Sequence, residues 1–92
     1  MRIQEVEIYS DAVNAAIMRH PGRQFPGLLL QGDTLHSMYR QVDRVCAIAK
    51  TKLTEDECDE IDELREWLYG YVEHYKQVLR EHGIELPFYE GV

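Results

Sequence analysis

The 92-residue sequence predicts an α+β fold in which a small three-stranded antiparallel sheet precedes two helices. Two observations carry this prediction. Short β-prone runs separated by Pro-Gly turns fill the first third of the chain, and apolar residues recur at helical spacing in the remainder. The change falls at Gly32-Asp33-Thr34, a sequence that can end a strand and cap a helix. We expect residues 1–92 to form a single domain.

The first and third strands are predicted at residues 3–9 and 27–31. In the first, apolar residues alternate with Glu5 and Glu7, as in a half-exposed strand. In the third, Leu28-Leu29-Leu30 is a continuous apolar run, which is typical of a strand covered on both faces. We therefore expect the third strand in the middle of the sheet, with helices on one side.

The segment between them, residues 12–20, fits either a strand or a helix. Its apolar residues have helical spacing from Val13 to Ile17. Pro21-Gly22 would end that helix after about two turns, a length at which helices are marginal. We favour a strand over residues 15–20, paired with the third strand across the Pro-Gly turns.

The first helix is predicted over residues 34–50, with Asp33 or Thr34 as its cap. The other side of this helix, which includes Arg40 and Arg44, is expected to contact water. Its apolar residues recur at intervals of three and four and share one face: Leu35, Met38, Tyr39, Val42, Val45, Cys46 and Ala49.

The second helix is predicted over residues 54–82. Thr54 and Glu57 have the spacing of a capping box at its start. Gly83 is placed as the left-handed residue that ends a helix, and an extended apolar tail is predicted at residues 84–92.

The composition restricts the classes of partner. A net charge of −7 argues against nucleic-acid binding by the chain itself, because such binding depends on neutralised phosphates, but it is compatible with a basic protein partner. No apolar run reaches the roughly 18–20 residues that cross a bilayer, and the first residues do not form a hydrophobic signal segment. We therefore expect a cytoplasmic protein that does not bind membranes.

No catalytic, cofactor-binding or metal-binding motif stands out. The serines have no base-and-orienter arrangement, and the glycines do not form a phosphate-cradling loop. One alternative is a metal-dependent enzyme or ligand-binding protein that uses a carboxylate face of the second helix, made by Asp59, Asp62, Glu63 and Glu66. A solvated face that matches the positive end of the helix dipole explains the same residues more simply.

Arg19 and Arg23 form a local basic cluster beside the first Pro-Gly turn. They are candidates for contact with an anion or an acidic partner. Exposed arginines are also common in hairpins, so the cluster has an ordinary structural explanation.

The second helix is expected to form a homodimer, because it carries more apolar surface than the shorter first helix can cover. Antiparallel pairing of two copies would bring the acidic run Glu55–Glu66 toward Lys76 and Arg80 of the partner subunit. The candidate interface residues are Leu64, Trp67, Leu68, Tyr71 and Tyr75.

Short motifs in the chain resemble those of HicB-type antitoxins. They are Pro26-Gly27, Gly32-Asp33-Thr34-Leu35 at the start of an amphipathic helix, and Gly83-Ile84-Glu85-Leu86-Pro87. The resemblance implies a small sheet backed by a helix, dimerisation and binding to a basic toxin, and it implies no catalytic residues. The longer pattern, with Val6-Glu7-Ile8-Tyr9-Ser10 and Arg19-x-Pro21-Gly22-Arg23, is also similar to small bacterial proteins of unknown function.

The sequence therefore does not identify one function. Our hypothesis is a small bacterial protein-binding or regulatory module of the antitoxin or immunity kind. It would act through protein contacts, without a cofactor and not as an enzyme.

Overall fold

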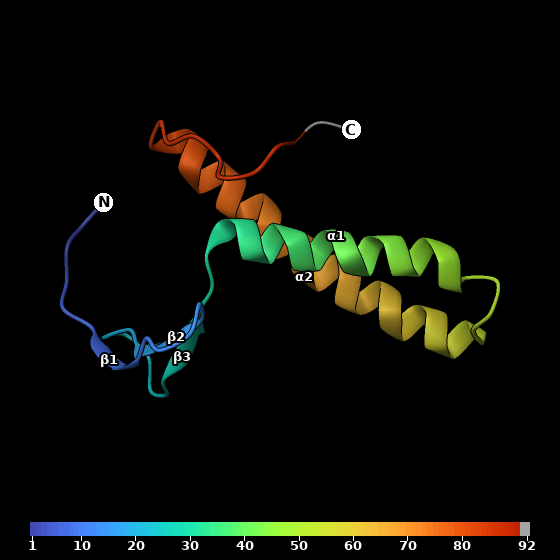
Figure 1. The fold of residues 1–92 in the computed structure, drawn as a ribbon, viewed down its shortest axis with the longest axis horizontal. Helices are drawn as coiled ribbons and strands as arrows, with labels where there is room; N and C mark the ends of the chain where they lie inside the picture. Colours follow the sequence, from blue (N-terminus) through green and yellow to red (C-terminus); the bar gives the residue numbers. More distant parts are fainter. Residues whose placement is uncertain (91–92) are drawn as a thin grey trace. The chain divides into compact units, whose positions relative to one another are not determined.

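The computed structural model describes residues 1–90 and has the α+β fold that the sequence predicts (Figure 1). A three-stranded antiparallel sheet is followed by two helices. The elements are β1 (Glu7–Ser10), β2 (Ala16–Arg19), β3 (Gly27–Leu29), α1 (Gly32–Ala49) and α2 (Glu55–Glu81). The tail predicted at 84–92 ends in residues 91–92, which lie outside the described part of the chain.

The elements belong to two compact units. The sheet unit runs from Met1 to Gln31 and contains the three strands, and the helical unit begins at Gly32. Both strand pairs fall in the first unit and the helix pair falls in the second, so each unit has its own internal packing. The expected single domain stays a prediction.

In the sheet unit, β2 is the middle strand and pairs antiparallel with both neighbours. Residues 16–19 are therefore a strand, as we favoured, and the helical alternative for this segment is wrong. The expected central position of the leucine strand is also wrong, because β3 is at an edge. Consecutive strands with short connections pair in chain order, which places the second strand in the middle.

β1 is shorter than the predicted strand at residues 3–9 because its partner ends. Glu7 pairs with Arg19, and the chain then turns, with the N–H of Arg23 donating to the carbonyl of His20 at 2.9 Å. β2 therefore offers no partner for the residues before Glu7.

Both ends of α2 have the caps that the sequence predicts. The Thr54 hydroxyl accepts from the N–H of Glu57 at 3.2 Å, and the Glu57 carboxylate accepts from the N–H of Thr54 at 3.0 Å. At the other end Gly83 has a φ of 66°, and the N–H of Ile84 donates to the carbonyl of Leu79 at 2.9 Å. These bonds satisfy backbone groups that a helix leaves unpaired at its ends.

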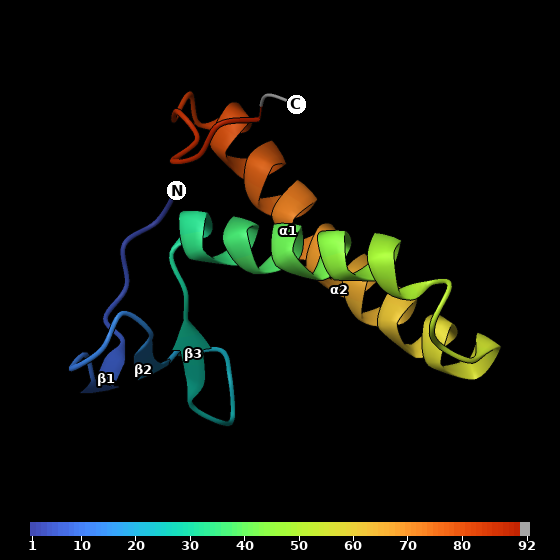
Figure 2. The ribbon, with the colours of Figure 1, turned by 45° about the vertical axis from the view of Figure 1, so that its right-hand side comes forward.

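α1 and α2 pack as a hairpin in which the two helices cross, and the C-terminal turns of α2 diverge from α1 (Figure 2). Cys46 and Val72 are buried between them, at 2% and 3% exposure. Gly32 lets the two helices approach, because a Cβ there would overlap the phenol ring of Tyr75. Within residues 1–90, neither helix combines the length and apolarity needed to cross a membrane.

Candidate interaction surface

The hairpin has an open apolar groove between its helices, with a volume of about 380 Å³. Met38, Val45 and Leu64 remain 43%, 45% and 44% exposed there, although each lies on the apolar face of its helix. Contact between two helices buries only part of each apolar face, so the outer part stays open. The lining residues of this apolar groove are Met38, Gln41, Val42, Val45, Ile61, Leu64 and Leu68.

Next to Leu64, α2 presents two exposed aromatic side chains. Trp67 is 63% exposed and Tyr71 is 52% exposed. The indole N–H of Trp67 donates to the hydroxyl of Tyr71 at 2.8 Å, and the two ring centroids are 6.4 Å apart. The bond fixes the orientation of the two rings relative to each other, and aromatic residues of this kind are favoured at protein interfaces.

The predicted interface residues do not all lie at this groove. Leu64, Trp67, Leu68 and Tyr71 line the apolar groove or are exposed beside it. Tyr75 is half-buried inside the helical unit, over Gly32 and with its ring centroid 6.3 Å from that of Phe88. Its 3.6-residue spacing is the same as that of the others, so sequence periodicity could not separate it from them.

An acidic groove of about 250 Å³ adjoins the apolar groove on the α2 side. It is lined by Glu60, Glu63, Leu64 and Trp67, and Leu64 also lines the apolar groove. Both glutamates are exposed. Among the described residues, neither forms an ion pair.

A basic groove of about 460 Å³ adjoins the apolar groove on the α1 side, and Gln41 lines both. Arg40 and Arg44 are one helical turn apart, and like charges at this spacing repel. Neither arginine is in an ion pair within residues 1–90. The groove is lined by His36, Ser37, Arg40, Gln41, Arg44, Phe88 and Tyr89.

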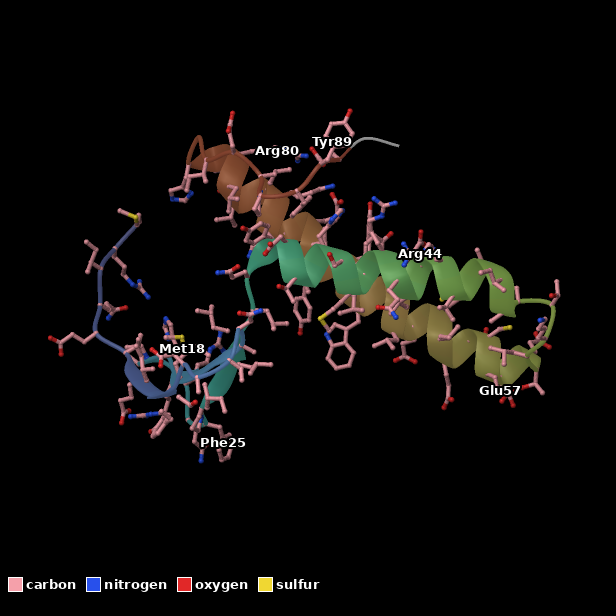
Figure 3. All side chains as sticks on the ribbon, viewed as in Figure 1. Met18, Phe25, Arg44, Glu57, Arg80 and Tyr89 are labelled. Carbon is pink, nitrogen blue, oxygen red and sulfur yellow. The ribbon has the colours of Figure 1, made fainter. Side chains whose placement is uncertain are left out.

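Our sequence interpretation missed this basic groove. It placed the arginines of the first helix in water and gave them no role. The spacing of four residues between His36, Arg40 and Arg44 was the available signal, because it aligns them on one face. The other wall comes from the tail, which carries Tyr89, and no local pattern predicts where a tail packs (Figure 3).

The tail is held against the helices by stacking and by ion pairs. Phe88 stacks on His36 with ring centroids 3.9 Å apart and an interplanar angle of 7°. Glu90 pairs with Lys76 at 2.8 Å and with Arg80 at 3.5 Å. The hydrogen bond from Lys76 lowers the pKa of Glu90, and burial followed by the charges of Arg40 and Lys76 lowers the pKa of His36.

These shifts predict that acid releases the tail in two steps. The pKa of His36 is lowered in the folded state, so neutral His36 favours the docked tail. This stabilisation is fully present above the ordinary pKa of 6.5 and is lost as the pH falls through the lower pKa of the folded state. The share of Glu90 is complete above 4.5 and is lost at still lower pH. The NMR chemical shifts of the Phe88 ring protons are altered by the stacked imidazole of His36, so they should report both steps.

Glu90→Gln is the control for this titration. It should remove the step at lower pH and keep the step that belongs to His36. A Phe88 signal that stays constant from neutral pH to below 4.5 would show that these groups do not hold the tail.

The sheet unit holds the predicted cluster of Arg19 and Arg23. The guanidinium of Arg19 is bound by Glu7, with 2.6 Å between Nε and Oε1, and it donates to the carbonyl of Arg23 at 3.4 Å. The contact with Glu7 raises the pKa of Arg19. Arg19 is therefore engaged within the sheet, and Arg23 is the exposed member of the pair.

The carboxylates of the alternative metal site have different surroundings. Asp62 has a buried Oδ1 atom that accepts no hydrogen bond from the described residues, and Glu66 accepts from Arg65 at 3.0 Å. Asp59 and Glu63 are exposed. Among residues 1–90, no group of three or more His, Cys, Asp or Glu side chains is placed to hold a metal ion.

Comparison with known proteins gives a family and no function. No curated protein and no solved structure matches the chain. A family model described as a family of unknown function, DUF6959, matches residues 1–88. This match spans both units, and the chain belongs to the DUF6959 family.

Proposed function

We propose that the protein is a small homodimeric protein-binding module of the antitoxin or immunity kind, acting in the cytoplasm through protein contacts. One observation carries the proposal. The apolar groove between α1 and α2 leaves side chains of both helices half exposed, with the oriented pair Trp67 and Tyr71 beside it.

Burial of this apolar face against another protein surface would be favourable in free energy. Burying apolar surface contributes roughly 25 cal/mol per Å². In a two-fold dimer each groove residue is buried twice, once in each copy, so a modest area per chain gives a substantial total. Contiguous apolar faces that are exposed on a soluble protein are often sites of protein interaction.

The antitoxin-like part of the proposal rests on the HicB resemblance and on the acidic run Glu55–Glu66. Seven of its carboxylate residues are exposed and only Asp62 is half-buried. Within residues 1–90, Glu66 is the only member of this run whose carboxylate is in an ion pair, and its partner is Arg65. Exposed carboxylates at this density favour a basic protein partner, because charge complementarity raises the association rate and disfavours acidic competitors.

Co-expression of two differently tagged copies tests the homodimer. Purification through one tag should bring the other tag with it at comparable yield. The control is the same pair of tagged chains expressed separately and mixed briefly at high dilution. Recovery of a single tag from co-expressing cells would contradict the proposal.

A further inference from the structure

The basic groove on α1 has the composition of a small-ligand site. Its described lining residues include arginine, histidine, serine and aromatic side chains, and none of them is acidic. We propose that this groove binds a small phosphate monoester that carries an aromatic ring, with the phosphate at Arg40 and Arg44 and the ring at Tyr89. Helical geometry turns these arginines away from Met38 and Val45 of the apolar groove, so the inference does not depend on the proposed homodimer.

The two arginines are placed to act on one anion. Arg40 and Arg44 are exposed and one helical turn apart, a spacing that brings their side chains to neighbouring points of the helix surface. Within the described part of the chain, neither arginine is in an ion pair. Their mutual repulsion is therefore uncompensated, and an anion between them would relieve it.

Two carboxylates adjoin the lining residues in the sequence, but cations hold both. Asp43 contacts Arg65 at 3.4 Å. Glu90 contacts Lys76 at 2.8 Å and Arg80 at 3.5 Å. These contacts leave the groove with a positive charge, although the whole chain has a net charge of −7.

The number and type of donors favour a phosphate over a carboxylate. One guanidinium fork satisfies a carboxylate with two bonds, whereas a phosphate monoester has a charge of about −2 near neutral pH and three strong acceptor oxygens. Two guanidinium groups match that charge. The hydroxyl of Ser37 is exposed in the same groove and offers a further donor.

The aromatic side chains of the tail favour a ring on the ester. Phe88 is stacked on His36, so these two rings form one wall of the groove. Tyr89 lies beside them and is 85% exposed, which leaves its ring open to stack on a second ring. The groove volume of about 460 Å³ falls in the range of roughly 300–1,000 Å³ that is usual for small-molecule sites.

Titration with phenyl phosphate, followed by NMR at about pH 7.5, tests the site. At this pH the ester is a dianion, because its second pKa is about 6. We expect saturable shifts of the amide signals of residues 36–44 and of the Tyr89 ring signals. Inorganic phosphate lacks the ring and benzoate has one charge, so each should bind several-fold more weakly.

The variant Arg40→Gln with Arg44→Gln should bind phenyl phosphate at least about tenfold more weakly. Its melting temperature without ligand should not fall, because the substitution removes two like charges that repel. The matched control is Lys50→Gln with Lys52→Gln, which removes the same charge from exposed positions outside the groove. This control should bind phenyl phosphate like the natural chain.

His36 and Tyr89 give two further readouts. Burial and the charges of Arg40 and Lys76 lower the pKa of His36, and the charge of Glu90 raises it. A bound phosphate would offset the charge of Arg40, so saturation with phenyl phosphate should move the pKa of His36 upward. Tyr89→Ala should weaken the binding of phenyl phosphate and leave the binding of inorganic phosphate unchanged.

The outcomes separate this inference from the proposed function. Equal affinities of the natural chain and the arginine variant for phenyl phosphate would overturn the site. An equal loss of binding in the lysine control would also overturn it, because it would indicate a general attraction of anions. Equal affinities for phenyl phosphate and inorganic phosphate would overturn the role of the ring. Binding as proposed by a chain that stays monomeric would support the site and contradict only the homodimer.

Discussion

Val72→Asp is expected to unfold the α1–α2 hairpin. Val72 is 3% exposed, so a carboxylate at this position would be buried without a partner. An uncompensated buried charge costs about 3–5 kcal/mol, which is a large part of the roughly 5–15 kcal/mol that stabilises a small domain. Circular dichroism should show a loss of most helical signal, and urea unfolding should shift to a much lower midpoint or disappear.

His74→Asp is the matched control, because it adds the same carboxylate two residues away on an exposed side of α2. It should change the free energy of unfolding by less than about 1 kcal/mol. A Val72→Asp chain that is as stable as this control would contradict the packing of the two helices.

Leu64→Glu is expected to separate the dimer without unfolding the chain. Leu64 is 44% exposed in the hairpin and lines both the apolar and the acidic groove. In the dimer, burial of the exposed part of Leu64 would contribute about 1 kcal/mol per copy, and the substitution removes this contribution. It also adds a carboxylate beside Glu60 and Glu63. Counted twice in a two-fold dimer, the apolar loss of about 2 kcal/mol should by itself raise the dissociation constant roughly thirtyfold, and the added carboxylates should raise it further.

The control for this variant is His74→Glu, which adds a carboxylate to the same helix and lines none of the three grooves. Both variants should keep the helical signal of the natural chain. Equal dissociation constants for Leu64→Glu and the natural chain would exclude the apolar groove from the interface.

The helices could be predicted closely because their signals are local. Thr54 and Glu57 cap α2 through bonds between residues three apart, and Gly83 ends it through its own backbone conformation. The choice of a strand for residues 15–20 also had a local cause, since Pro21-Gly22 leaves too little length for a helix.

The errors concern contacts between residues that are distant in the sequence. The leucine run of β3 predicted a central strand, but chain order placed β2 there. Tyr75 has the same periodicity as Leu68 and Tyr71, yet the tail and Gly32 enclose it. The basic groove needs Phe88 and Tyr89 of the tail opposite Arg40 and Arg44, and only tertiary packing brings these segments together.

Sedimentation equilibrium of the natural chain over a range from low to high micromolar concentration is the most direct test of the central claim, that the helical hairpin is half of a symmetric dimer. The mass of one chain is 10.8 kDa. We predict a mass that rises with concentration to twice this value and then stays there, since a closed two-fold interface adds no third copy. A mass of 10.8 kDa at every concentration would contradict the account.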